Sequence, residues 1–280
     1  MKKILLPTDF SEHSWNAIAY ALQLFKKQEC HFTLLNTYTP IIFQYEYMQS
    51  SSAQLDIVDA MKETSKKGLQ RIAKKIKQEF NNPKHTFTQK SAFNMLVLEI
   101  EELYKQQTVD LIVMGTKGAS GIKRVLLGSN AIHVIKNAKC PIMVVPSDFH
   151  FESPLEMLFP TDLEIDFQKK QLQPVIEIAS AYHARIHVLH VSNGQKLTAE
   201  QETNRKTLEK QLKKVAHLFH IERHKNIPKA IAEFQTKSRI NLLVMVNNKH
   251  SFFENLFFQP VIKQIGFHLN IPLWVIPTKA

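Results

Sequence analysis

The most concentrated chemical signal in the chain is a cluster of glycines. The chain has 7 glycines among 280 residues, and Gly115, Gly118, Gly121 and Gly128 fall close together. Glycine permits backbone conformations that other residues avoid and lets a ligand approach the main chain closely. A helix beginning directly after Gly128 would point its free N–H groups and its positive dipole end at that ligand. The cluster therefore predicts an anion site, although glycines after a strand can also serve turns alone.

Polar and basic residues around these glycines agree with an anion site. Ser129 stands where it can either cap the helix or donate its hydroxyl hydrogen to a phosphate, and the sequence leaves both roles open. Lys117, Lys123 and Arg124 can balance the charge of a bound anion.

Alternating strand and helix patterns position this loop in the first half of the chain. The apolar run at 4–8 is typical of a strand buried on both faces of a parallel sheet. Trp15, Ile18, Leu22 and Phe25 repeat at helical spacing, with Ser11 as the expected N-cap. Strands are then expected at 31–37, 85–89, 110–115 and 141–145, and helices at 69–80, 96–103 and 129–137.

The second half repeats the first. Lys3 to Phe10 returns as Glu156 to Leu163, and Cys140 to Pro146 returns as Ile271 to Pro277. Between these strands the pattern indicates helices at 172–179 and 208–215 and a strand at 186–191. Each half therefore opens and closes with the same strand.

This pattern predicts an α/β protein of two tandem Rossmann-like domains, residues 1–147 and 154–280, with a linker at about 150–153. Each domain is expected to be an open five-stranded parallel sheet with right-handed crossovers and helices on both faces. Ligands of such sheets bind at the carboxyl ends of the strands, where the strand order reverses.

The loop also carries a family resemblance. Gly115-Thr116-Lys117-Gly118, followed after nine residues by Gly128-Ser129, resembles the nucleotide loop of the universal stress protein family. Pro7-Thr8-Asp9 resembles that family's other hallmark. The resemblance covers about 2–147, and more weakly 155–278, and is similar to the tandem form. It implies an adenine nucleotide alpha hydrolase-like fold and a regulatory rather than metabolic role.

In nucleotide-binding members of that family, ATP lies across the carboxyl ends of the sheet. By resemblance, Asp9 and the backbone near Thr37 would contact adenine or ribose, and Met114 would flank the ribose. Read without the family, Asp9 is also explained as a charge at a helix N-terminus. The binding residues that the resemblance implies, for ATP with or without Mg²⁺, are Pro7, Thr8, Asp9, Thr37, Met114, Gly115, Gly118, Gly128, Ser129 and Asn130.

The second half departs from the loop pattern. When Pro277 is aligned with Pro146, the loop positions are occupied by Val246, Lys249, Phe252, Gln259 and Pro260 in place of Gly115, Gly118, Gly121, Gly128 and Ser129. Side chains would occupy the space for phosphates, and proline lacks an N–H donor. ATP is therefore expected in the first domain only. Asp162 is expected to begin a helix, and Phe252, Phe253, Phe257 and Phe258 are expected to fill the vacant pocket, pack on the partner domain or form an aromatic ligand box.

Composition narrows the classes of function that the chain could have. The net charge of +11 raises the question of nucleic acid, but no nucleic-acid-binding motif accompanies it, and Lys62, Lys66, Lys67, Lys74, Lys75 and Lys77 follow a polar helix face. No apolar run reaches the about 18 residues of a membrane span, so a cytoplasmic protein is expected. Cys30 and Cys140 are expected to be buried thiols.

Histidines in the second half raise the question of zinc. His187 and His190 are expected to face opposite sides of a strand. His217 and His220 are expected to share a helix face, where no cysteine or carboxylate completes a ligand set. Scattered histidines are therefore favoured over a metal site.

Three functions follow from these observations. The first is a non-enzymatic ATP-binding regulator, the second a slow ATPase or phosphoryl transferase, which would need Mg²⁺ ligands, and the third a nucleotide-free interaction protein. The stretch 38–52 is expected to be a loop or lid beside the site, or a packing segment for a partner. Because the last strands pair in the family, an internal pseudo-dimer of the two domains is expected, along with a homodimer.

Overall fold

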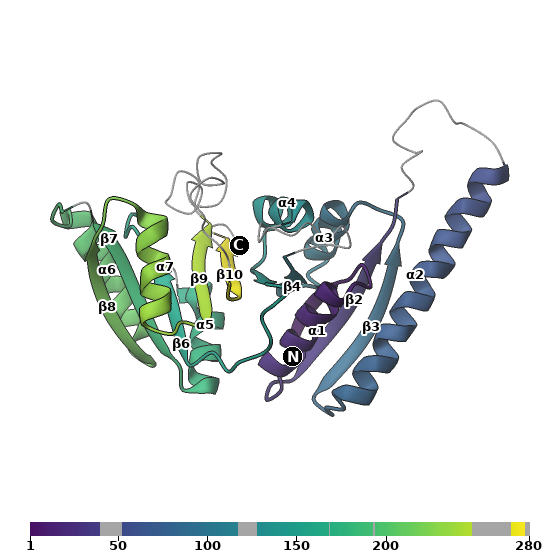
Figure 1. Ribbon diagram of the computed structural model, residues 1–280, viewed down its shortest axis with the longest axis horizontal. Helices are drawn as coiled ribbons and strands as arrows, with labels where there is room; N and C mark the ends of the chain where they lie inside the picture. Colours follow the sequence, from purple (N-terminus) through teal and green to yellow (C-terminus); the bar gives the residue numbers. More distant parts are fainter. Residues whose placement is uncertain (40–51, 117–127, 168, 193, 248–269, 278–280) are drawn as a thin grey trace. The chain divides into compact units, whose positions relative to one another are not determined.

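The computed structural model describes residues 1–39, 52–116, 128–167, 169–192, 194–247 and 270–277 (Figure 1). The chain divides into two compact units, Met1–Phe151 and Glu152–Ala280. Some predictions lie outside the described residues: most of the lid at 38–52, the centre of the glycine loop with Gly118, Gly121 and the basic residues at 117, 123 and 124, and the second-domain positions 249–260 with their phenylalanines.

The first unit is an open parallel sheet with the strand order β3-β2-β1-β4-β5. Its elements are β1 (Lys2–Pro7), α1 (Glu12–Leu24), β2 (Cys30–Thr37), α2 (Ser52–Glu79), β3 (His85–Ala92), α3 (Leu96–Lys105), β4 (Leu111–Gly115), α4 (Ser129–Asn137) and β5 (Ile142–Val145). The chain moves from β1 to β2 and β3 and then returns to the other side of β1. The strand order therefore reverses between β1 and β4, which is where such sheets bind ligands.

Helices cover both faces of this sheet. On β3, the Lys90 ammonium lies 2.9 Å from Glu99 of α3, whereas the hydroxyl of the next residue, Ser91, donates to Ser65 of α2 at 2.8 Å. Because successive strand residues point to opposite faces, α2 and α3 lie on opposite faces of the sheet. The prediction of helices on both faces is confirmed for this unit.

Local signals explain the first helix. Ser11 is its N-cap, and the Ser11 hydroxyl accepts a hydrogen bond from the Ser14 N–H at 3.2 Å, as predicted. Ile18, Leu22 and Phe25 are buried against the sheet. Helix α1 is thus held by a capping bond at its start and by an apolar face along its length.

The second unit repeats this architecture with the strand order β8-β7-β6-β9-β10, again all parallel. Its elements are β6 (Glu156–Pro160), α5 (Lys169–Tyr182), β7 (Arg185–Ser192), α6 (Ala199–Leu212), β8 (Ala216–Arg223), α7 (Ile227–Lys237), β9 (Leu242–Asn247) and β10 (Leu273–Pro277). Strands β6, β9 and β10 are buried along most of their length. Both units are therefore Rossmann-like, as predicted.

The prediction of a helix that continues through Val215 and includes His217 and His220 is wrong. Helix α6 ends at Leu212, and both histidines lie on strand β8. The short run of residues after Leu212 fits both helical and strand spacing of its apolar residues. Its pairing with β7 makes it the strand β8. Neighbouring residues of β8 then face opposite helices: Phe219 lies under Arg205 of α6, and His220 packs on Phe234 of α7.

Other surface and core predictions have clear outcomes. Five lysines of α2 are exposed, at 62, 66, 67, 74 and 77, and the Lys75 ammonium lies 4.0 Å from the centre of the Trp15 ring. Both cysteines are buried. Burial raises the pKa of Cys30 to about 11 and that of Cys140 to about 12. Among the described helices, none combines the length and apolarity that crossing a bilayer requires.

Candidate functional site

A cavity of about 250 Å³ opens at the carboxyl ends of β1, β2 and β4. It lies at the reversal of strand order in the first unit, the position expected for a ligand of this fold. Nine of the ten residues implied by the family resemblance line it: Pro7, Thr8, Asp9, Thr37, Met114, Gly115, Gly128, Ser129 and Asn130. The tenth, Gly118, lies outside the described residues.

The floor of the cavity is set by the turn after β1. The backbone N–H of Thr8 donates to the carbonyl of Leu35 at 2.8 Å, and the Thr8 carbonyl accepts from the side-chain amide of Asn36 at 2.7 Å. The Thr8 hydroxyl accepts from the N–H of Phe10 at 3.0 Å and lies 2.9 Å from the hydroxyl of Ser14. These bonds hold the chain rigidly where β1 leaves the sheet.

Asp9 follows directly and lies at the exposed rim of the cavity. One oxygen of its carboxylate accepts hydrogen bonds from the Ser11 N–H at 3.1 Å and the Ser11 hydroxyl at 2.6 Å. The next residue, Phe10, has a φ of 66°, so the backbone turns sharply there. Asp9 is thus oriented by its own turn, lies two residues before the N-cap of α1 and lines the cavity.

The opposite wall is the start of α4. Gly128 is its N-cap, with no side-chain capping bond and no acidic residue in the first turn. The first N–H groups of a helix have no partner within the helix, and those of Ser129, Asn130 and Ala131 belong to residues that line the cavity. Of the two roles left open for Ser129, that of N-cap belongs to Gly128, because Ser129 is the first residue of the helix.

The described residues on either side of the segment 117–127 are joined beside this helix: the N–H of Gly128 donates to the carbonyl of Thr116, and both residues line the cavity. Gly115, at the end of β4, leaves the space above the strand free of a side chain. Backbone donors, a helix start and open space thus meet at one point, as an anion site requires.

The sequence did not single out several of the residues that build the cavity. Asn36, Ser14, Leu35 and Leu96 also line it. The sequence held a usable signal for Asn36, since it is a polar residue in a strand that is otherwise apolar on that face. In the structure its side chain is 9% exposed. Ser14 and Leu96 had none, because they enter the cavity only through the packing of α1 and α3.

The second unit repeats the turn with almost the same bonds. The N–H of Thr161 donates to the carbonyl of Leu189 at 2.9 Å, and its hydroxyl accepts from the N–H of Leu163 at 2.9 Å. Leu163 has a φ of 61°, and the Asp162 carboxylate accepts from the N–H of Glu164 at 3.1 Å. The prediction that Asp162 begins a helix is wrong, since α5 begins at Lys169.

Two replacements distinguish this turn from the first. The sheet register places His190 at the position of Asn36. The Nδ1 of His190 lies 3.1 Å from the carbonyl of Thr161, where the Asn36 amide lies 2.7 Å from that of Thr8. The register also places Val246 at the position of Gly115, since Val246 pairs with Ile276 of the last strand and Gly115 pairs with Val145. A buried isopropyl group therefore stands where the first unit has open space.

Among the described residues, the histidines of the second unit are not gathered as a set of metal ligands. His187 and His220 lie within hydrogen-bonding distance, but no three His, Cys, Asp or Glu side chains gather as metal ligands would in the part of the chain that the structure describes. His190, which the strand period places on the opposite face from His187, is occupied by the Thr161 carbonyl.

The fold and cavity define a class: a tandem protein of two Rossmann-like α/β domains, with a cavity at the strand reversal of the first. Comparison with known proteins narrows this class to a family. Residues 1–146 and 156–277 both match the Universal stress protein family. The chain belongs to this family and contains its domain twice.

Individual relatives agree. Universal stress protein MJ0531 of Methanocaldococcus jannaschii is 33% identical over 144 residues, which cover 51% of this chain and 81% of that protein. A crystal structure of a universal stress protein from Archaeoglobus fulgidus has a TM-score of 0.68 at 20% identity, covering 97% of this chain and 94% of the other. A putative universal stress protein from Pseudomonas aeruginosa has a TM-score of 0.57 at 13% identity, covering 99% and 93%. At these identities the two structures support the tandem fold alone.

Proposed function

We propose that this universal stress protein binds ATP in its first domain only and acts as a non-enzymatic regulator. The observation that carries the proposal is the cavity itself, where the uncapped start of α4 and the side-chain-free end of β4 face the rigid Thr8–Asp9 turn. Phosphates are bound well by the free N–H groups of a helix start. The carboxylate of Asp9, at the rim, can accept hydrogen bonds from a ribose or an adenine.

The chemistry of the cavity favours binding over catalysis. Asp9 is the one acidic residue among the described residues that line it, and one of its oxygens is engaged by Ser11. Phosphoryl transfer needs ligands for Mg²⁺ and a group that orients the nucleophile. A magnesium ion arriving with ATP would meet the Asp9 carboxylate, but the lining supplies no second carboxylate to hold it.

Binding is tested with a fluorescent ATP analogue and the full chain. Gly118→Asp adds a negative charge to the loop and is expected to weaken binding about 100-fold, because the charge repels the phosphates. Gln195→Asp adds the same charge to an exposed loop of the second domain and is expected to leave the affinity unchanged. Equal affinities of Gly118→Asp and wild type would contradict the proposal that this loop binds the phosphates.

Two further measurements separate the proposal from its rivals. Release of phosphate above background that disappears in Asp9→Ala would favour an ATPase. A protein purified without nucleotide that shows no thermal shift with ATP would favour an interaction protein that works without nucleotide. The homodimer stays a prediction, and the mass of the protein in solution tests it.

A further inference from the structure

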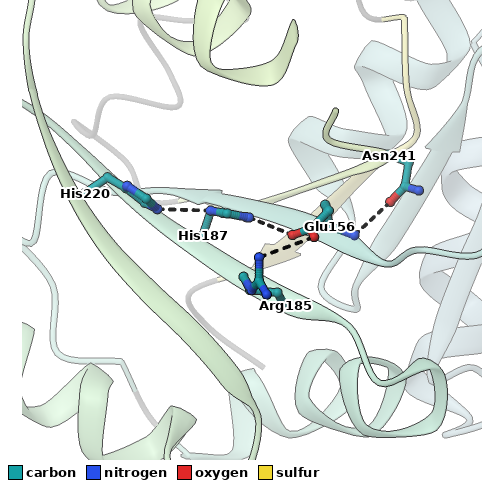
Figure 2. A network of polar contacts seen from close by, with 5 residues as sticks. All are labelled: Glu156, Arg185, His187, His220 and Asn241. Carbon is teal, nitrogen blue, oxygen red and sulfur yellow. Dashed lines mark hydrogen bonds and ion pairs between the residues drawn. The ribbon is translucent and has the colours of Figure 1, made fainter. Parts of the chain in front are cut away.

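Two histidines on neighbouring strands of the second domain form a hydrogen-bonded pair (Figure 2). His187 Nδ1 of β7 lies 3.0 Å from His220 Nε2 of β8, and His187 Nε2 lies 2.7 Å from a carboxylate oxygen of Glu156 on β6. The two rings are stacked, with centroids 5.1 Å apart and an angle of 26° between their planes. Both ring nitrogens of His187, which is 6% exposed, therefore have a partner.

An aromatic side chain closes the pair from the helix side. Phe234 of α7 packs edge-on against both rings, with centroids 5.6 Å from His187 and 4.8 Å from His220. Strand β8 is the last strand in the order of this unit and pairs with β7. The histidine pair thus joins an outer strand and its covering helix to the centre of the sheet.

Charged groups face the pair from each element packed around it. Glu156 is the anion in direct contact with His187, and Arg185 of β7 lies 3.6 Å from the same carboxylate. Around His220, Glu222 of β8 favours a positive ring, whereas Lys237 of α7 opposes it. The carboxylate that contacts the pair therefore lies on the His187 side.

The hydrogen bonds restrict where protons can sit. When both rings are neutral, His187 donates from Nε2 to Glu156, so its Nδ1 is an acceptor and His220 must donate from Nε2. A singly protonated pair keeps one donor and one acceptor across the 3.0 Å contact, so this hydrogen bond survives the first added proton.

A second added proton has no such arrangement. It would place N–H groups on both His187 Nδ1 and His220 Nε2, facing each other across 3.0 Å with two positive rings stacked. Burial, together with the neighbouring His187 ring, lowers the pKa of His220 from its ordinary value of 6.5. The folded second domain therefore resists the doubly protonated pair.

We propose that the His187–His220 pair is a proton switch of the second domain. It takes up one proton without rearrangement, and a second proton separates the rings and loosens β8 and α7 from the sheet. In this protein the domain without the glycine loop would then respond to acidification, whereas the domain with the loop responds to nucleotide. The switch does not depend on ATP binding.

The sign of the pH effect follows from linkage. A histidine whose folded pKa is lowered binds protons more readily in the opened state, so acid favours opening. The stabilising contribution of His220 is complete above the ordinary value of 6.5 and is lost as the pH falls below it towards the lowered folded pKa. One linked proton changes the opening equilibrium by at most about tenfold per pH unit.

Amide hydrogen exchange of the full chain tests the switch between pH 7.5 and pH 5, with rates corrected for the intrinsic effect of pH. We expect the opening equilibrium of β8 and α7 to rise by up to about tenfold per pH unit below about 6.5, and β4 in the first domain serves as the internal reference. His220→Gln keeps a hydrogen-bonding side chain that takes up no proton, and it should abolish this rise.

His217→Gln is the matched control. His217 lies on the same strand, and its Nδ1 contacts the backbone carbonyl of Val215, so this variant should keep the wild-type pH dependence. Identical pH dependence in His220→Gln and the wild type would overturn the proposal.

A second measurement needs no stable variant of the pair. Nitrogen-15 NMR of the imidazole rings in the wild type should show both rings protonated at Nε2 at pH 8. On uptake of the first proton, one of the two nitrogens in the contact should stay unprotonated. Two independent titrations at the ordinary histidine value would overturn the switch.

Discussion

The two domains carry the same turn at the end of their first strand, yet differ in what stands opposite it. Thr8 and Thr161 share three contacts: the N–H donates to the neighbouring strand, the hydroxyl accepts from the N–H two residues later, and a buried amide or imidazole contacts the carbonyl. Across the sheet, the first domain has Gly115 and the second has Val246. The turn is therefore part of the scaffold of the fold, whereas the residue at the end of the fourth strand differs between the units, a glycine in the first and a valine in the second.

The two domains also differ in where their buried polar side chains form hydrogen bonds. In the first domain the polar contacts converge on the cavity, at the carboxyl ends of the strands. In the second, Glu156 and His187 lie at the start and the middle of β6 and β7 and bond to each other and to His220 rather than to the turn. Two copies of one fold can thus share their backbone arrangement while their buried polar side chains lie at different places in the sheet.

Replacing Gly115 of the first domain by valine, the residue at the equivalent position of the second domain, is expected to have the largest effect on ATP affinity. Gly115→Val should lower the affinity for ATP about 100-fold, or ~2.7 kcal/mol, because the isopropyl group fills the space above β4. Gly115→Ala, which adds one methyl group, should lose less. Isothermal titration calorimetry measures both, and Val246→Ala serves as the control that leaves ATP binding unchanged. Unaltered binding in Gly115→Val would contradict this account of the difference.

Both cysteines lie in the first domain and are buried with raised pKa values. Their alkylation at pH 7.5 should therefore be slow and should report opening of that domain, since the thiolate is the reactive form. ATP at about 100 times its Kd should slow alkylation up to about 100-fold, by stabilising the folded domain. Mass spectrometry of iodoacetamide-treated protein follows this. Equal protection in Gly115→Val would show that it does not come from the cavity.

Replacing Asn36, which binds the Thr8 carbonyl in the turn after β1, should have a smaller effect, seen in the stability of the first domain. Asn36→Ala leaves the buried carbonyl of Thr8 without its amide donor and should destabilise the first domain by about 1–3 kcal/mol. Asn36→His copies the second domain, where His190 makes the equivalent bond, and should cost less than Asn36→Ala. Urea unfolding, followed by cysteine reactivity, compares them. Equal losses in both variants would show that the two turns are not interchangeable.

Much of the fold was predictable because its signals are local. Apolar runs and helical spacing located the strands and helices of the first domain, Ser11 was correctly predicted as a cap, and the repeat of Pro7-Thr8-Asp9 predicted a second copy of the fold. The failures came where local signals are ambiguous. The segment after Leu212 fits both periods, and the helix after Asp162 begins several residues later than its counterpart after Asp9.

The sequence by itself determined the class of the fold, the duplication and the glycine cluster, because these depend on residue types and their spacing along the chain. Only the tertiary structure showed that Asn36, Ser14 and Leu96 complete the cavity, since residues far apart in sequence meet there through sheet order and helix packing. It also decided the role of His187. Along the chain it is one of several scattered histidines, and only the register of β6, β7 and β8 brings Glu156 and His220 to its two nitrogens.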